Sequence, residues 1–140
     1  MDFFKVLQYG QKASKNNWKI RRKICRFILK IYYQCDIDLA AEFDKDTYFC
    51  HQGFGIVINP RVKLGGGTCV QHCVTIGDLN AGGPVPVIGR NCFIGARAII
   101  LGNVHIGNNV KIGAGAVVLE DIPDNCTAVG IPARIIKREG

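Results

Sequence analysis

The 140-residue sequence contains no apolar run long enough to cross a membrane, which takes about 20 consecutive residues. The only apolar run near the start, Phe27 to Tyr33, is short and interrupted by Lys30, so we expect no signal peptide. No Cys-x-x-Cys pair is present, which argues against a structural zinc site, and no metal is expected. The seven cysteines are an odd number without regular spacing, which is typical of reduced thiols and favours the cytoplasm.

Acidic residues are almost absent from the first 35 positions. This segment carries nine lysines and arginines against Asp2 alone, whereas residues 36–140 carry nine basic and ten acidic side chains. The net charge of +7 therefore belongs to an N-terminal arm, and the rest of the chain is close to neutral. A chain of this length is expected to form one domain with a substantial core.

Apolar residues recur every six positions in the second half of the chain. This period matches neither the 3.6-residue period of a helix nor the two-residue period of a strand. It is typical of a parallel β-helix, in which each hexad forms one short strand and one corner. We predict an all-β domain of this kind over residues 36–140, after a helical arm over residues 1–35, with the free thiol of Cys92 packed inward. The inward positions are Ile88, Ile94, Ile100, Ile106, Ile112 and Val118, each followed four residues later by a second apolar residue.

The basic arm has its own pattern, because residues 17–34 predict an amphipathic helix. One interpretation packs its apolar face on an end of the β-helix and leaves its basic face in water. The other places the helix on an anionic membrane surface, for which Trp18 and the cations are suited. Nucleic-acid binding is disfavoured, because aromatic residues are not interleaved with the basic ones. The apolar positions are Ile20, Ile24, Phe27 or Ile28, and Ile31.

The hexad frame breaks twice. Between Phe49 and Ile58 the step is nine residues, and residues 77–86 form a segment rich in Gly and Pro without the apolar pattern. Of the three histidines, His51 lies inside the first break, His72 lies between inward positions, and His105 lies at an outward position. Most lone histidines are structural or solvated, and His105 is assigned to that class. His51 is therefore the strongest candidate for a catalytic role. For His72, a catalytic role and a structural role both stay open.

The spacing around His51 is more selective than the hexads. Asp36 and Ile37 come first, His51 follows fifteen residues after Asp36, and a Gly-Ile-Val-Ile run then covers residues 55–58. With the later Gly-containing hexads, this pattern resembles the catalytic domain of serine acetyltransferases and their relatives among hexapeptide-repeat acyltransferases. The resemblance extends from Asp36 through Ala133, and it implies a left-handed β-helix that assembles as a homotrimer.

The resemblance also implies catalytic roles. It makes His51 the general base and Asp36 the residue that orients its imidazole. A hydroxyl group attacks a thioester poorly unless a base takes its proton as the bond forms, and a carboxylate on the other ring nitrogen fixes the tautomer. An oxyanion donor is expected among the backbone N–H groups near Gly77 and Asp78, and His72 is grouped with this acceptor region.

Acetyl-coenzyme A is the implied acyl donor, held in a groove between neighbouring subunits of the trimer. Ala96 and Ala114 match the coils that contact its pantetheine arm, where small side chains allow a thin ligand to approach closely. Lys111 and Arg134 are candidate contacts to its phosphates.

The sequence departs from serine acetyltransferases around the acceptor. Cys50 stands where they carry an Asp before the catalytic His, and Pro84 and Val85 stand where they carry Arg-His. Those groups would hold the amino and carboxylate ends of serine. We therefore predict transfer to a sugar hydroxyl in surface polysaccharide or lipopolysaccharide synthesis, at the inner face of the membrane, with serine O-acetylation as the alternative.

Two further alternatives stay open. A metal enzyme of the γ-carbonic anhydrase kind would need three histidines on one zinc ion, but the sequence shows no close pair among His51, His72 and His105. A non-catalytic trimeric scaffold that docks on membranes through residues 1–35 would not bind acetyl-coenzyme A.

Overall fold

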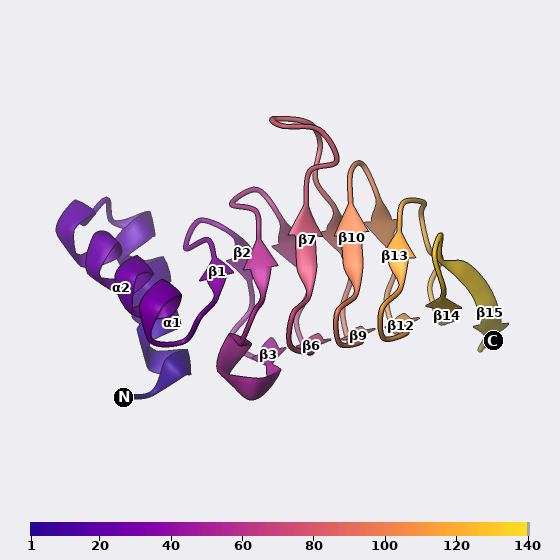
Figure 1. Cartoon of the computed structure of the whole chain (residues 1–140), viewed down its shortest axis with the longest axis horizontal. Helices are drawn as coiled ribbons and strands as arrows, with labels where there is room; N and C mark the ends of the chain where they lie inside the picture. Colours follow the sequence, from indigo (N-terminus) through magenta and orange to yellow (C-terminus); the bar gives the residue numbers. More distant parts are fainter. Residues whose placement is uncertain (140) are drawn as a thin grey trace.

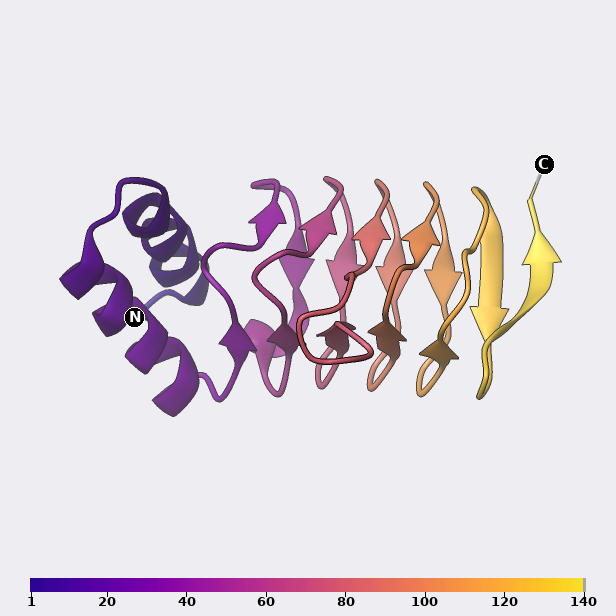
Figure 2. The same ribbon diagram turned by 90° about the horizontal axis from the view of Figure 1, so that it is seen from above.

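Residues 1–139, which the computed structural model describes, form two helices followed by a coil of short strands (Figure 1). The helices lie at one end of the coil, and the two chain termini lie at opposite ends (Figure 2). The elements are α1 (Phe3–Lys15), α2 (Lys19–Ile31), β1 (Asp36–Ile37), β2 (Glu42–Phe43), β3 (Tyr48–Phe49), the 3₁₀ turn η1 (Cys50–Gly53), β4 (Val57–Ile58), β5 (Lys63–Leu64), β6 (Cys69–Val70), β7 (Thr75–Gly77), β8 (Val87–Ile88), β9 (Phe93–Ile94), β10 (Ile99–Leu101), β11 (His105–Ile106), β12 (Lys111–Ile112), β13 (Val117–Val118), β14 (Cys126–Val129) and β15 (Arg134–Arg138).

Every third strand joins the same sheet, so the coil has three flat sides. The first sheet has the order β1-β4-β7-β10-β13, the second has β2-β5-β8-β11, and the third has β3-β6-β9-β12-β14. All of these pairs are parallel, and β15 closes the third sheet as an antiparallel neighbour of β14. A regular coil takes 18 residues, as in the pairing of Val57 with Thr75. The six-residue period is therefore one side of a three-sided coil.

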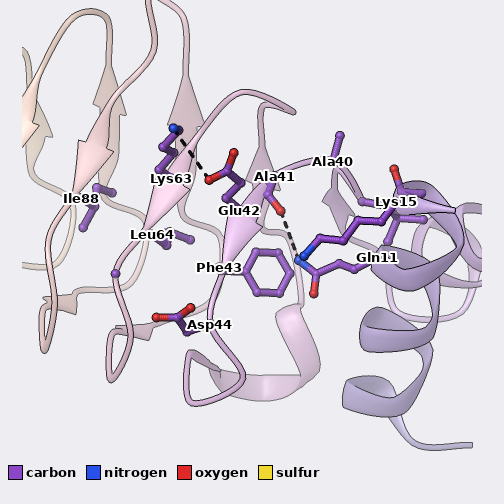
Figure 3. A pocket seen from close by; sticks show the side chains of 13 residues that line it. Gln11, Lys15, Ala40, Ala41, Glu42, Phe43, Asp44, Lys63, Leu64 and Ile88 are labelled. Atoms are coloured by element: carbon purple, nitrogen blue, oxygen red, sulfur yellow. Dashed lines mark hydrogen bonds and ion pairs between the residues drawn. The ribbon is translucent and has the colours of Figure 1, made fainter. Parts of the chain in front are cut away.

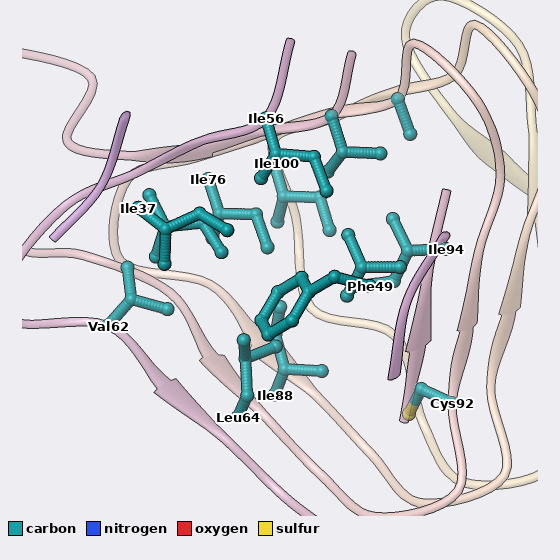
Figure 4. Close-up of a cluster of buried hydrophobic side chains, with 14 of the residues drawn as sticks. Ile37, Phe49, Ile56, Val62, Leu64, Ile76, Ile88, Cys92, Ile94 and Ile100 are labelled. Carbon is teal, nitrogen blue, oxygen red and sulfur yellow. The ribbon is translucent and has the colours of Figure 1, made fainter. Parts of the chain in front are cut away.

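The core is a column of aliphatic side chains inside the coil (Figure 4). Most strands have an outward residue followed by an inward one, so inward side chains from successive coils stack on each other. Full burial of such a side chain stabilises the fold by about 1.5–3 kcal/mol. The predicted inward residues from Ile88 to Ile122, Cys92 among them, are at most 4 % exposed, which confirms the hexad assignment.

The two helices close the N-terminal end of this column. Phe3 and Leu7 of α1 and Leu29 of α2 are buried against the first coil. Gly10 allows a close approach, because a Cβ there would lie 2.7 Å from Cδ2 of Leu39. The sequence pattern predicts only one helix here, over residues 17–34; α1 is missed because two of its four buried positions are Gly10 and Ala13, which give a weak apolar signal.

The packed face of α2 also differs from the first interpretation of the arm. The helix does contact the end of the coil, but through Cys25 and Leu29. Most of the predicted apolar face points into solvent instead, with exposed fractions of 54–75 %, and of its positions only Ile28, the alternative to Phe27, is partly buried against the core. Among the described residues, no helix is both long and apolar enough to cross a bilayer. The exposed side chains are Ile20, Ile24, Phe27 and Ile31.

Candidate active site

His51 lies on a strained turn at the corner between the third and first sheets. His51 has φ 51° and Gln52 has φ 55°, so two consecutive residues with side chains adopt the left-handed conformation, and Gly53 follows at φ 74°. Residues other than glycine rarely adopt this conformation, at a cost of about 1–3 kcal/mol each, and such strain clusters at functional sites. The turn lengthens its coil, since Asp36 pairs with Val57 after 21 residues instead of 18. The imidazole is consequently exposed at the corner.

Close packing beneath the turn holds it in place. A Cβ at Gly53 would lie 2.7 Å from Cζ of Phe3 and 3.3 Å from Cδ1 of Ile37. A Cβ at Gly55 would lie 2.6 Å from Sγ of Cys73 in the next coil. Helix α1 therefore supports the turn from one side, and the next coil supports it from the other.

The structure brings His72 next to His51. The two rings lie 5.0 Å apart between centroids and are nearly perpendicular, at 89°. The Nδ1 atom of His72 is buried and has no hydrogen-bond partner among residues 1–139. A buried polar atom without a partner is uncommon and calls for an explanation. The histidines are far apart in the sequence, and they form a pair only because they lie in neighbouring coils.

His72 belongs to a column of equivalent corner residues in which Phe54 precedes it, because the Phe54 carbonyl accepts a hydrogen bond from the Cys73 N–H at 2.9 Å. The His72 carbonyl accepts a hydrogen bond from the Arg97 N–H at 3.0 Å, and the Ala96 carbonyl accepts one from the Gly115 N–H at 2.8 Å. His72, Ala96 and Ala114 therefore occupy matching positions in three successive coils. This column runs away from His51 along one edge of the coil and presents small side chains after His72, as the coenzyme assignment requires.

Cys50 precedes His51 and makes sulfur contacts. Its Sγ lies 3.5 Å from Sγ of Cys69 and accepts a hydrogen bond of 3.0 Å from the Gln71 side-chain amide. Burial, followed by the neighbouring Cys69 thiol, raises the pKa of Cys50 to about 11. The thiol is therefore neutral at pH 7, and no negative charge stands at this position beside His51.

Asp36 lies at the start of β1, in the same coil as His51. Its carboxylate is half-exposed and forms an ion pair with Lys30, at 3.0 Å between Nζ and Oδ2. Within residues 1–139, the carboxylate of Asp36 is paired with Lys30 and forms no hydrogen bond with the imidazole of His51. In this structure Asp36 is therefore paired with Lys30, whereas its expected role requires a hydrogen bond to His51.

The loop over residues 78–86 leaves the coil at a different corner, between the first and second sheets (Figure 1). The Asp78 carboxylate accepts hydrogen bonds from the Gly82 N–H at 2.8 Å and from the Asn59 side-chain amide at 3.3 Å. The Gly82 bond is the main reason that the pKa of Asp78 lies below its ordinary value, and Arg61 at 3.9 Å also lowers it. The carbonyl of Gly77 accepts a hydrogen bond from the Gly102 N–H at 3.0 Å. Asp78 thus organises the loop, and one chain alone leaves the loop and His51 at separate corners.

The two candidate phosphate contacts lie toward the C-terminal end. Lys111 is the exposed, outward residue of β12. Arg134 begins β15, where its guanidinium lies 3.9 Å from the Glu120 carboxylate. Both side chains are on the surface, and Arg134 already has an acidic neighbour.

A surface cavity of about 490 Å³ opens beside His51. Its wall includes Phe4 of α1, whose ring stacks on Tyr48 at 5.5 Å between centroids. This wall is not expected from the sequence, because the apolar pattern does not predict α1. The other lining residues are Met1, Asp2, Phe3, Phe49 and Gln52.

A larger groove of about 680 Å³ lies between α1 and the second sheet (Figure 3). It contains an ion pair between Glu42 and Lys63 at 3.8 Å, and the Gln11 amide donates a hydrogen bond to the Ala41 carbonyl at 3.1 Å (Figure 3). His51 does not line it. Size alone therefore does not identify the site, and the smaller cavity at the strained turn is the better candidate. Within residues 1–139, no three His, Cys, Asp or Glu side chains are grouped as metal ligands.

Comparison with known proteins shows which family has this architecture. The family model for the bacterial transferase hexapeptide (six repeats) matches residues 86–120. Over 133 residues the chain is 34 % identical to a serine acetyltransferase of Staphylococcus epidermidis, covering 94 % of this chain and 62 % of that protein. The chain belongs to the hexapeptide-repeat transferases. It is also 44 % identical over 94 residues to a serine acetyltransferase of Synechococcus elongatus, covering 66 % of this chain and 38 % of that protein.

Solved structures of this transferase family extend the match to the whole fold. A crystal structure of serine acetyltransferase from Brucella abortus superposes with a TM-score of 0.90 at 31 % identity, covering 99 % of this chain and 56 % of that one. A structure of that enzyme in complex with coenzyme A gives a TM-score of 0.90 at 30 % identity, covering 97 % of this chain and 55 % of that one. The predicted left-handed parallel β-helix is thereby confirmed. The chain spans only about half the length of several of these relatives.

Proposed function

We propose that this chain is an O-acetyltransferase that moves an acetyl group from acetyl-coenzyme A to a hydroxyl group. The observation that carries the proposal is the strained, exposed turn that places His51 at a corner of a serine acetyltransferase-like coil. The same corner continues into the small residues Ala96 and Ala114. The solved complex of a relative with coenzyme A supports the choice of donor.

In this mechanism His51 takes the proton of the acceptor hydroxyl while its oxygen attacks the thioester carbonyl. The new C–O bond forms, the C–S bond breaks, and the proton passes from the imidazole to the departing thiolate. A positioned base of this kind contributes about 10²–10⁴-fold to the rate. Backbone N–H groups near Gly77 and Asp78 are the proposed donors to the oxyanion.

Asp36 is proposed to orient the imidazole during the reaction. Its present ion pair with Lys30 is exposed, and such pairs contribute at most about 1 kcal/mol. The carboxylate of Asp36 can therefore exchange Lys30 for the imidazole of His51 at a small cost in free energy. The role of Asp36 depends on that exchange.

The proposed active unit is a homotrimer. In one chain, the 78–86 loop and His51 occupy different corners of the coil. Three parallel coils around a threefold axis would set one corner of each chain beside a different corner of its neighbour. The loop of one subunit could then complete the site at His51 of the next, with Lys111 and Arg134 near the coenzyme phosphates.

Serine is the acceptor that the comparisons favour, because the relatives reported above are serine acetyltransferases. This result supports serine O-acetylation, the alternative drawn from the sequence, better than transfer to a sugar hydroxyl. A sugar hydroxyl in surface polysaccharide synthesis is the second candidate, because the neutral thiol of Cys50 offers no charge to an amino group. Serine is therefore the first acceptor to test.

The test is thiol release from acetyl-coenzyme A with serine, simple sugars and nucleotide-sugars as acceptors. We expect His51→Ala to lower acetyl transfer by about 10²–10⁴-fold. His105→Ala is the matched control, since His105 is an exposed histidine on β11 and its loss should leave the rate unchanged. Full turnover by His51→Ala would refute the assignment of the base, and preferential acetylation of a sugar would restore the second candidate.

A further inference from the structure

Helix α2 carries an exposed apolar stripe that no part of the described chain covers. Ile20, Ile24, Phe27 and Ile31 recur at the spacing of one helix face, and their exposed fractions are 75, 54, 65 and 65 %. The helix already buries the opposite side through Cys25 and Leu29. The helix thus has two apolar faces, and only one of them is used by the fold.

A row of cations runs beside this apolar stripe. Lys19, Lys23, Arg26 and Lys30 each precede one member of the stripe, so they repeat at the same helical spacing along its flank. Arg21 and Arg22 add two further charges, and α2 contains no acidic residue. Within residues 1–139, Lys30 is the one member of this row with an ion-pair partner, the Asp36 carboxylate at 3.0 Å.

Aromatic side chains flank α2 at its two ends. Trp18 immediately precedes α2, is 36 % exposed, and lies under the Arg21 guanidinium at 4.9 Å. Tyr32 immediately follows α2 and is 66 % exposed. Rings with one polar edge favour the boundary between lipid and water.

We propose that α2 is a membrane-surface helix that docks the enzyme on an anionic lipid bilayer. The helix lies parallel to the surface, the apolar stripe enters the boundary between headgroups and acyl chains, and the cationic row contacts the anionic headgroups. Each cation near such a surface strengthens binding about fivefold. The proposal does not rest on the acetyl transfer proposed above, although Lys30 takes part in both.

The positive charge beside the stripe favours an anionic bilayer over a second copy of the chain. Two α2 helices packed through their apolar stripes would bring two rows of four cations together, and neither helix has an acidic side chain to pair with them. An anionic bilayer supplies negative charge along the whole row and an apolar interior for the stripe. The helix is 13 residues long, so it can lie on the surface but cannot span it.

The experiment measures binding of the full chain to vesicles by sedimentation and by the fluorescence of Trp18, the only tryptophan. Vesicles of phosphatidylcholine are compared with vesicles that contain about 30 % phosphatidylserine. We expect binding to the anionic vesicles, a blue shift of Trp18, and weaker binding at high salt. Phe27→Asp should lower binding by about tenfold or more, and Lys23→Gln should lower it about fivefold.

Two substitutions outside α2 serve as controls, one matched to Phe27→Asp in exposure and one matched to Lys23→Gln in charge. Ile136 is 64 % exposed on β15, close to the value for Phe27, and Lys45 is an exposed lysine outside the helices. Ile136→Asp and Lys45→Gln should bind like the parent protein. The proposal fails if anionic vesicles do not bind at low salt, or if Phe27→Asp binds as well as Ile136→Asp. Self-association that is lost in Phe27→Asp, without vesicle binding, would identify a second copy as the occupant.

Discussion

Substitution of Gly53 tests whether the turn at His51 is held by packing from α1. Gly53→Ala has two separable costs. At φ 74° an alanine is in the left-handed conformation, which costs about 1–2 kcal/mol. Its Cβ would also lie 2.7 Å from Cζ of Phe3, and that ring is only 2 % exposed, so it must shift within a packed core. Overpacking of this kind costs about 1–3 kcal/mol.

Gly115→Ala isolates the first of these costs. Gly115 has φ 70°, almost the same as Gly53, but a Cβ there would meet nothing within 4 Å. We expect Gly115→Ala to lower the free energy of unfolding by about 1–2 kcal/mol and Gly53→Ala to lower it by about 2–5 kcal/mol.

Urea unfolding followed by circular dichroism measures this difference, with both variants at the same protein concentration because assembly affects apparent stability. Gly53→Ala should also reduce acetyl transfer, since the shift of Phe3 displaces the turn that carries His51. Equal destabilisation by the two substitutions would refute the tight contact between α1 and the turn.

Two further predictions concern the thiol and the loop. Cys50, with its pKa raised to about 11, should react with iodoacetamide at pH 7 about two orders of magnitude more slowly than an ordinary thiol, and rapid labelling in peptide mass spectrometry would contradict its burial. Because the folded-state pKa of Asp78 is lowered, its contribution to loop stability should be complete above about pH 4 and should be lost as the pH falls through the folded-state pKa. The amide chemical shift of Gly82 should report this loss, and in Asp78→Asn it should not vary over the same range.

The core could be predicted from the sequence because each strand is so short. With one inward residue in most strands, the hexad period directly gives the buried positions, as Ile94 and Ile100 show at 0 % exposure. The arm could not be predicted in the same way. An apolar period identifies a helix face, but it does not say what covers that face, and α2 packs through Cys25 and Leu29 instead.

The histidine pair could have been predicted from the sequence, but only if the length of the coil between the two residues had been known. The insertion at the first break makes that coil 21 residues long, as the pairing of Tyr48 with Cys69 shows. His51 and His72 are also 21 residues apart, so they occupy neighbouring coils. The side-chain partners of Asp36 and Cys50 depend on rotamers and on helix packing, which a repeat pattern does not encode.

Lys30 belongs both to the cationic row of α2 and to the surroundings of Asp36, so it connects the two proposals. If the Lys30 ion pair competes with His51 for the Asp36 carboxylate, Lys30→Ala should raise acetyl transfer. An exposed pair contributes at most about 1 kcal/mol, so the increase should not exceed about fivefold. In the Asp36→Asn background the same substitution should have no effect, because no carboxylate remains to be released. Lys12→Ala, which removes an exposed lysine of α1, is the control for charge. A fall in acetyl transfer in Lys30→Ala, with Lys12→Ala unchanged, would show that the ion pair holds Asp36 in place for catalysis instead of withholding it.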